Sequence, residues 1–190
     1  GENTIFDSIS QKRLVTNTTA SGGSGYIPTY FNFLNNGFYM DWSAGGMPND
    51  NGTTYASWTF RKAAKFFDVV TFTAGTSTNQ RVSHNLGSVP GCIIVKCTTE
   101  ATSWWVYHRS LGNNKVIYLD STAGQDTTST AWNSTTPTST VFSLGTDSEV
   151  NGSGHNNVAY CWAEVAGFSK FGSYTGNGSA DGPFVYCGFR

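Results

Sequence analysis

The segment around His84, one of three histidines in the chain, is the first place to look for catalysis. Paired with a distant Asp and Ser, His84 would supply the acid–base chemistry of a hydrolase. The same stretch is a dense turn signal, because Asn85 and Gly87 tolerate positive φ and Pro90 fixes its own φ. It also lacks the Gly-x-Ser-x-Gly elbow that exposes a strained nucleophile. We interpret it as a turn that reverses the chain into a strand at Cys92–Lys96.

Acidic residues suggest two other chemistries. Asp147–Gly152 combines carboxylates with amide oxygens, which are calcium ligands, but it lacks the Asp-x-Asp-x-Asp-Gly order of a calcium loop. We expect a solvated loop there. A glycosidase needs two carboxylates across a cleft, and no spacing places two of the candidates in that way: Asp120, Asp147, Glu149 and Glu164. The sequence therefore predicts a protein that is not an enzyme and uses no metal or cofactor.

The strongest aromatic cluster comprises Trp104, Trp105, Tyr107 and His108. Successive residues of a strand face opposite ways, so one Trp must lie inside and the other outside or at an interface. An exposed Trp beside Tyr107 or His108 would stack on a sugar ring or anchor a partner chain. The alternative is one Trp in the core and one packed under a loop. These four residues are the candidate binding site, for a glycan or for a partner.

The composition excludes several classes of function. Charged residues make up 12% of the chain and the net charge is −1, which argues against electrostatic capture of nucleic acid. Aromatic residues make up 15%, which argues against disorder. No apolar run approaches the roughly 20 residues of a membrane span, so we expect no membrane insertion.

The cysteines show no metal-ligand spacing. Cys92 and Cys97 lie five residues apart on one expected strand, so their side chains face opposite ways and do not pair with each other. Cys161 and Cys187 lie on expected strands beside aromatic residues. We predict free, buried thiols, with a single disulfide as the alternative; free thiols fit assembly in a reducing cytoplasm.

Short apolar alternations bounded by Gly, Asn, Pro or Ser predict strands throughout the chain. They favour an all-β fold, an antiparallel β-sandwich or jelly roll. A short helical turn is expected at Ser121–Thr130, a mobile loop at Gly22–Gly25, and burial of the aromatic stretch Tyr30–Leu34. The expected strands are Ile5–Asp7, Gly37–Met40, Tyr55–Phe60, Val69–Thr73, Cys92–Lys96, Trp104–His108, Val116–Leu119, Thr140–Leu144 and Val158–Trp162.

The chain also repeats itself. Phe72 and Tyr174 lie 102 residues apart in similar surroundings, and Ala56 and Ala159 lie 103 apart. Three such matches occur in the same order, which predicts the back part of one sandwich unit at 1–66, a complete unit at 67–166 and the opening hairpin of another at 168–190. The matched segments are Phe67–Gly75 with Phe168–Gly176, Asn51–Trp58 with Gly154–Trp162, and Gly1–Ser8 with Gly112–Ser121.

Several of these segments together resemble a repeated domain of structural proteins of marine tailed phages, which are described as tail-fibre, appendage or capsid-associated proteins. The resemblance implies a concanavalin A-like or laminin-G-like sandwich and a virion component assembled in the host cytoplasm. Its partners would be other copies of itself and other virion proteins. It implies no catalytic or binding residues. The segments that carry it are Phe67–Thr73, Val82–Lys96, Trp105–His108, Pro137–Phe142 and Phe168–Gly178, with Ile5–Ser8, Lys12–Leu14 and Asn17–Ala20 at the start.

Two expectations follow from this organisation. The 168–190 hairpin of one chain is expected to pair with the unpaired edge of residues 1–66 in the same or a neighbouring chain, because unpaired sheet edges are adhesive. Otherwise the sequence is a segment of a longer polypeptide. The alternative function, from a different class, is a carbohydrate-binding module that recognises host surface glycans.

Overall fold

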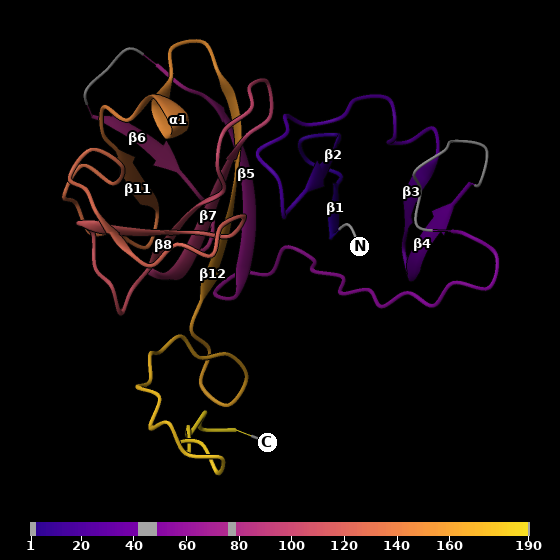
Figure 1. Cartoon of the computed structure of the whole chain (residues 1–190). Coiled ribbons are helices and arrows are strands. Elements are labelled where there is room, and N and C mark those ends of the chain that lie inside the picture. Colours follow the sequence, from indigo (N-terminus) through magenta and orange to yellow (C-terminus); the bar gives the residue numbers. More distant parts are fainter. Residues whose placement is uncertain (1–2, 42–48, 76–78, 190) are drawn as a thin grey trace.

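A six-stranded antiparallel sheet organises the molecule, in the order β10-β9-β8-β7-β12-β5 (Figure 1). The computed structural model describes residues 3–41, 49–75 and 79–189. Within these residues the chain is all-β, with a single short helix. The bounds of the main-sheet strands are β5 Phe67–Thr73, β7 Pro90–Cys97, β8 Trp105–His108, β9 Lys115–Tyr118, β10 Asp126–Thr127 and β12 Asn156–Ala163.

Strand β12 lies inside the sheet and is buried on both faces for most of its length. Its sequence is nearly continuous in apolar residues, as a strand covered on both sides requires. It pairs with β5 on one side and β7 on the other, with Tyr160 opposite both Val69 and Ile94. Each face therefore needs its own covering layer.

One covering layer is the antiparallel pair of β6 (Gln80–Ser83) and β11 (Val141–Leu144), together with the helix α1 (Ser148–Asn151). Between this layer and the main sheet lies a core that we call the main core. The arrangement is sandwich-like, with apolar side chains of both layers removed from water. The main core consists of Val82, Leu86, Ile93, Val95, Trp105, Tyr107, Val116, Ala131, Trp132, Phe142, Leu144, Val150, Ala159, Cys161 and Ala163.

The opposite face of the sheet is covered by the hairpin of β1 (Thr4–Asp7) and β2 (Lys12–Val15). Leu14 of this hairpin is fully buried against the sheet. We call the resulting cluster the hairpin core. Its buried members are Leu14, Phe67, Val69, Trp104, Val158 and Tyr160.

A third small layer lies beyond the hairpin, at the right of Figure 1: β3 (Phe31–Leu34) paired with β4 (Gly37–Met40). Alternation along β1 makes this possible, because Ile5 packs toward the hairpin core while Phe6 packs toward β3. The Phe6 and Phe31 rings stack with centroids 4.2 Å apart. The β1–β2 hairpin thus lies between the main sheet and the β3–β4 pair.

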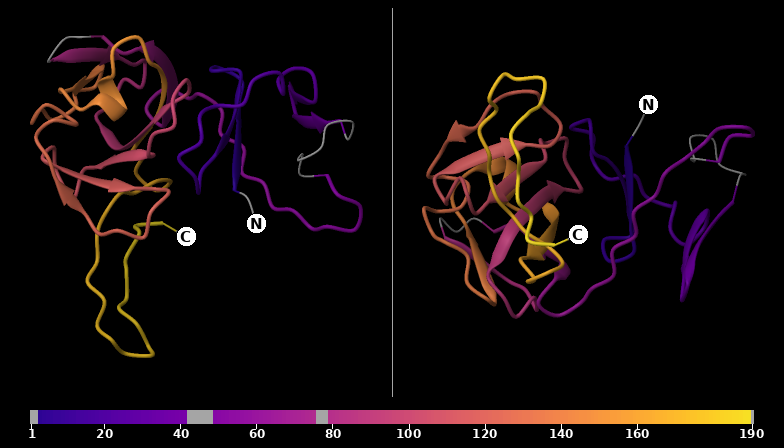
Figure 2. Two further views of the ribbon diagram at one scale, coloured as in Figure 1. Left: turned by 45° about the horizontal axis from the view of Figure 1, so that its top comes forward. Right: turned by 90° about the horizontal axis from the view of Figure 1, so that it is seen from below.

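Residues 168–189 leave the end of β12 as an arm that projects away from the sheets and then runs back, forming a long open loop in which Lys170 lies over the ring of Tyr186 (Figures 1 and 2). We call this segment the arm. Its base is held by Ser169, which forms an antiparallel bridge with Val165 and donates from its hydroxyl to the carbonyl of Ala163. Apart from the bridge at Ser169, the described residues of the arm form no β-structure.

Several expectations need correction. Tyr55–Phe60 is exposed coil rather than a strand, and Ser121–Thr130 holds the short strand β10 rather than a helical turn. The glycines at 22–25 are tied down: Gly23 forms an antiparallel bridge with Arg13, and Gly22 N–H donates to the carbonyl of Thr98. These backbone bonds hold the stretch against the body of the protein, so it is not a free loop.

The aromatic stretch Tyr30–Leu34 is buried only in part. Phe31 is buried between Phe6 and Phe38, whereas Phe33 and Leu34 are exposed. One face of the β3–β4 pair has a covering layer that receives Phe31. Phe33 lies on the same face, with its ring 5.0 Å from that of Phe31, but outside the covered cluster. The other face carries Leu34 into solvent.

Candidate functional site

The candidate binding residues around β8, Trp104, Trp105, Tyr107 and His108, are divided between the two faces of the main sheet. Trp105 and Tyr107 point into the main core, and Trp104 points into the hairpin core. His108 is half-buried, and its ring meets Phe171 of the arm edge-on at 6.2 Å. The four residues therefore do not converge on one surface, and both tryptophans are buried. The expectation of a Trp outside the fold is wrong; the alternative, with one Trp in the core and one packed under a loop, is closer, because Trp104 lies under the N-terminal segment.

Trp105 is braced by the helix α1, which the sequence did not predict. Its Nε1 donates to Glu149 Oε2 at 3.0 Å, and the same oxygen accepts from Ser103 N–H at 2.9 Å. Asp147 caps the helix by accepting from Glu149 N–H at 3.0 Å. The stretch Asp147–Gly152 is thus a bracing turn and not the solvated loop that was expected. Among the residues described here, no group of three or more His, Cys, Asp and Glu side chains is placed to hold a metal.

Trp104 joins the hairpin to the sheet. Its Nε1 lies 3.1 Å from the Val15 carbonyl and 3.2 Å from that of Thr18, and its backbone N–H donates to Asp120 Oδ1. A buried indole N–H requires such an acceptor. Because both carbonyls belong to the N-terminal segment, this Trp serves as an internal anchor and presents no face for a sugar ring.

Lys96 is a second buried anchor on the same face. Its side chain is fully buried, and its Nζ donates to the carbonyls of Thr19 at 3.0 Å and Thr102 at 2.7 Å. Burial lowers the Lys96 pKa, and the nearby Cys97, Asp120 and Glu149 oppose that shift. A buried ammonium with two carbonyl acceptors is a structural clamp on the segment that follows β2.

The turn at His84 agrees in part with the prediction from the sequence. Gly87 has φ of +69°, whereas Asn85 is outside the left-handed region and instead donates its N–H to Asp68 Oδ2 at 2.7 Å. His84 is buried and stacks on Phe142, and its Nδ1 accepts from Leu86 N–H. Desolvation lowers the His84 pKa, opposed by a backbone hydrogen bond to Thr138 and by Asp68. These contacts describe a core histidine within a turn.

Each of the carboxylates considered for glycoside hydrolysis has a structural contact. Asp120 binds the Trp104 backbone, Asp147 caps the helix and Glu149 binds Trp105. Glu164 accepts from Arg109 Nη1 at 2.6 Å in a half-exposed ion pair. Asp147 and Glu149 are joined by the capping bond of the helix, so their arrangement is that of a helix start.

The four cysteines are free. Cys97 and Cys161 are buried and Cys92 is half-buried, as expected, but Cys187 on the arm is exposed. Burial raises the Cys92 pKa to about 12 and raises that of Cys161 as well, so both are protonated at neutral pH. Cys187 is exposed because the arm has no covering layer.

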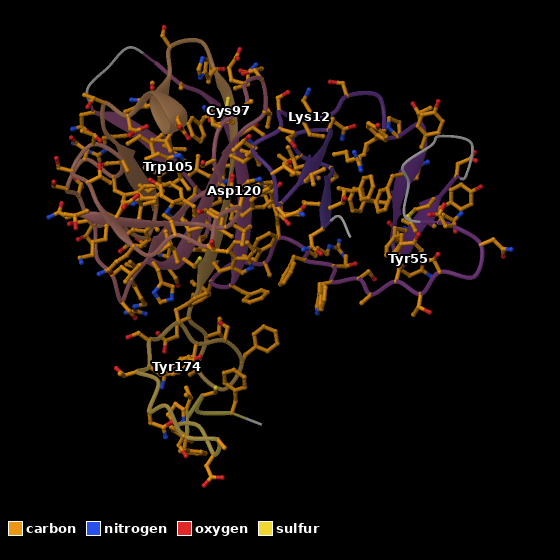
Figure 3. The ribbon with its side chains drawn as sticks, viewed as in Figure 1. Lys12, Tyr55, Cys97, Trp105, Asp120 and Tyr174 are labelled. Atoms are coloured by element: carbon orange, nitrogen blue, oxygen red, sulfur yellow. The ribbon has the colours of Figure 1, made fainter. Side chains whose placement is uncertain are left out.

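Two exposed aromatic segments are the surface that reasoning from β8 missed. The first is residues 53–60, the connecting segment, which carries Trp58 with 82% of its side chain exposed. The second is the arm, which carries Phe184 with 91% exposed. Figure 3 shows Tyr55 on the connecting segment and Tyr174 on the arm, both away from the main sheet that holds Trp105. The other large exposed side chains of the two segments are Tyr55, Phe60, Phe168, Tyr174, Val185, Tyr186 and Phe189.

The signal for this surface was present in the sequence. Both segments are members of the repeat, and the repeat marks them as strands. Among the described residues, neither segment is paired into a sheet. Exposed aromatic side chains on an extended backbone define a candidate interaction surface.

The fold and this surface define an all-β protein of antiparallel sheets with exposed aromatic segments. The sequence matches the family described as a domain of unknown function, DUF7483, over residues 2–190, so the chain belongs to that family. No curated protein and no solved structure matches it. Among the described residues, no helix is long and apolar enough to cross a membrane.

Proposed function

We propose that this chain is a non-catalytic structural module that assembles with other chains through its exposed aromatic segments. The observation that carries the proposal is the state of the connecting segment and the arm. In the part of the chain that the structure describes, both belong to no sheet, and both are rich in large exposed apolar side chains. Such side chains contribute roughly 25 cal/mol for each Å² of apolar surface that a partner removes from water.

The rest of the molecule supports a rigid scaffold. Trp104, Lys96 and Glu149 make buried or half-buried bonds that tie loops and the N-terminal hairpin to the main sheet. The polar and aromatic residues that could have formed a functional site are thereby engaged in structural contacts. A module of this kind holds its loops in fixed positions on a rigid scaffold. The neighbouring chains would then determine which partner binds to it.

The biological setting that we propose is a virion, as a tail-fibre, appendage or capsid-associated protein, assembled in the host cytoplasm. The resemblance of Val82–Lys96 and Phe168–Gly178 to phage structural repeats supports this setting. The sandwich-like packing across the main core agrees with the finer proposal of a concanavalin A-like or jelly-roll unit, and the internal repeat with tandem units. The partners would be other copies of this chain and other virion proteins.

Assembly is tested by measuring the mass of the purified chain over a range of concentrations by light scattering or sedimentation. The combined substitution Phe184→Ser and Tyr186→Ser removes two exposed arm side chains, of which Tyr186 contacts only the exposed end of Lys170 among the ring contacts described. We expect lower assembly with an unchanged melting temperature. Tyr39→Ser, on exposed β4, is the matched control and should leave assembly unchanged. A protein that stays monomeric at all concentrations would contradict the proposal.

The carbohydrate-binding alternative has one supporting observation, the exposed ring of Trp58. A ring with both faces in water is able to stack on a sugar. Binding to a glycan array that is lost in Trp58→Ser, in a chain that does not assemble, would favour this alternative over the structural module.

A further inference from the structure

Two turns in this structure have the same backbone design. Ala63 and Phe67 exchange both N–H···O bonds across a tight turn, and Val165 and Ser169 do the same. Each turn contains one residue in the left-handed region, Lys65 at φ +65° and Gly167 at φ +75°. The corresponding residues are 102 positions apart, as are Phe66 and Phe168, whose rings meet edge-on at 4.9 Å.

The shared turns fix how the repeat maps onto the structure. Counting back 102 residues from β12 leads to the connecting segment, with Trp58 at the position of Tyr160 and Phe60 at that of Trp162. This register replaces the alignment of Ala56 with Ala159, which is one residue out. Counting forward 102 residues from β5 leads to the start of the arm, with Phe171 at the position of Val69.

In the main sheet these two elements are direct neighbours. β12 pairs antiparallel with β5, placing Tyr160 opposite Val69 and Asn157 opposite Phe72. Among the described residues, the connecting segment is thus a β12-type segment that pairs with no β5-type strand, and the arm is a β5-type segment that pairs with no β12-type strand. Both have exposed backbone and side chains.

Resting on the proposed function, we infer that the arm of one copy pairs antiparallel with the connecting segment of a second copy, in the register that β5 and β12 use. That register places Phe171 of one copy opposite Trp58 of the other, and Tyr174 opposite Tyr55. The pairing adds a strand to an unpaired edge, and the two aromatic pairs add cross-strand contacts.

The side-chain pattern fits this pairing. Tyr160 and Trp162 of β12 pack toward the hairpin core, and Trp58 and Phe60 are large residues at the same positions. Ala159 and Cys161 on the opposite face of β12 are small, as are Ser57 and Thr59. Alternating large and small positions therefore repeat with the period of two that a strand requires.

Packing within one chain points to a second copy as the partner. Phe60 lies against Phe67 and Trp162 on the face covered by the hairpin. Phe171 instead lies over Gly91, where an added Cβ would overlap its ring. The Phe171 ring also meets His108 of β8 edge-on at 6.2 Å. The two segments therefore leave the sheet at different strands, the connecting segment beside β5 and β12 and the arm beside β7 and β8, and they diverge in Figure 1.

The inferred contact joins two different surfaces, so it is heterologous. Each copy offers one arm and one connecting segment, and its own arm remains free for a third copy. Interfaces of this type produce rings when the rotation closes and filaments when it does not. Two copies that exchange arms would close as a dimer, and other rotations would give larger rings or filaments.

The test uses paired cysteines in the full chain, with exposed Cys187 first replaced by Ser. One chain carries Ala56→Cys and a second, with a different tag, carries Ser173→Cys; these positions are opposite in the inferred register. Mild oxidation with copper phenanthroline should yield a disulfide between the two differently tagged chains. The control pair, Ala56→Cys with Gly172→Cys, is slipped by one residue and faces away, so it should cross-link about tenfold less.

The outcomes separate this inference from the proposed function. Cross-linking of the matched pair between tagged chains, but not of the slipped pair, supports the inferred register. Equal cross-linking of both pairs, or a disulfide that forms only within one chain carrying both cysteines, overturns it. Chains that assemble by mass without either cross-link overturn it too, while leaving the structural module standing. Chains that neither assemble nor cross-link overturn both.

Discussion

The Tyr160 hydroxyl donates a 3.1 Å hydrogen bond to Asp7 Oδ2, joining residues that are 153 positions apart. Both side chains are buried between the N-terminal hairpin and the main sheet. The Asp7 carboxylate also accepts from Ile9 N–H and from the Ser10 hydroxyl, so it closes the β1–β2 turn and docks it in the same place. Docking of the hairpin is therefore coupled to the formation of its turn.

Tyr160→Phe should weaken this docking. The substitution keeps the ring and removes the hydroxyl, leaving a buried carboxylate with one donor fewer, at a cost of about 1–3 kcal/mol in the free energy of unfolding. Urea denaturation followed by fluorescence measures the change. Tyr39→Phe, at an exposed position on β4, is the control and should change stability by less than about 0.5 kcal/mol. Equal effects of the two substitutions would show that the bond to Asp7 contributes nothing.

Leu14→Ala tests how much the hairpin core contributes. Leu14 is fully buried between β2 and the main sheet, so truncation leaves a cavity and should cost about 2–5 kcal/mol. Leu34→Ala removes the same atoms from a side chain that is 56% exposed and should have little effect. Hydrogen exchange should show faster exchange in β1 and β2 for the first variant alone. Unchanged protection of the hairpin in Leu14→Ala would contradict the layered packing.

Glu149→Gln tests the brace behind Trp105. One oxygen of Glu149 accepts from both Trp105 Nε1 and Ser103 N–H, and bonds to a charged acceptor are worth about 1.5–3 kcal/mol. We expect a loss of roughly half that value, because the amide oxygen still accepts but carries no charge. Thermal unfolding provides the measurement, with Glu100→Gln at an exposed site as the control. A melting temperature equal to that of the control would show that the bonds from Glu149 to Trp105 and Ser103 do not stabilise the fold.

Alkaline pH should destabilise the fold. Burial, and then the charge and hydrogen bond of Asp7, raise the Tyr160 pKa well above its ordinary value of 10.0. Burial, followed by Asp126, raises the Tyr118 pKa to about 12. A raised folded pKa means that the folded state holds its proton more tightly. The stability is therefore complete below the unfolded pKa near 10.0 and is lost as the pH rises through the folded value.

The measurement is the urea midpoint from about pH 8 to about pH 11.5. Removing the ionisable hydroxyl in Tyr118→Phe should flatten part of the decline. A midpoint that stays constant over this range would contradict the raised pKa values of both tyrosines. An unchanged slope in Tyr118→Phe would assign the decline to other groups.

Thiol labelling should single out Cys187. It is the exposed cysteine of the arm, whereas Cys92 and Cys161 are shielded and have pKa values raised by burial. A thiolate is the reactive form of cysteine. Cys92 and Cys161 should therefore react slowly, because they are shielded and because their thiols stay protonated. Native protein should react with one equivalent of a thiol reagent quickly and with the rest only on unfolding. Loss of the fast phase in Cys187→Ser confirms the assignment; a fast phase that persists contradicts it.

The strand content of residues 67–166 could be predicted from the sequence because local patterning and tertiary packing agree there. The strands expected at Val69–Thr73, Cys92–Lys96 and Val158–Trp162 all occur within slightly different bounds. Tyr55–Phe60 has the same kind of pattern but forms coil. A strand needs a neighbour to bond with, and this segment has none among the described residues. Pattern alone does not reveal whether that neighbour is present.

The candidate site was harder to predict for a similar reason. The alternation of Trp104 and Trp105 correctly separates them between two faces, but it does not reveal that the β1–β2 hairpin covers the second face. The helix α1 was missed because four residues are too few for a helical period. The exposure of Trp58 and Phe184 depends on which layers are absent, which is a property of the assembled fold.

The two matching turns carry different residues at the left-handed position, and this difference changes the conformational strain in each turn. At the first turn the left-handed position is Lys65, which is held in a conformation that costs a side-chain-bearing residue about 1–2 kcal/mol. At the second turn it is Gly167, for which both hands of the backbone are similar in energy. The bend at the base of the arm is therefore formed without that conformational cost, although both turns are closed by the same pair of backbone hydrogen bonds. A glycine in place of Lys65 would relieve the first turn of strain that the second turn never carries.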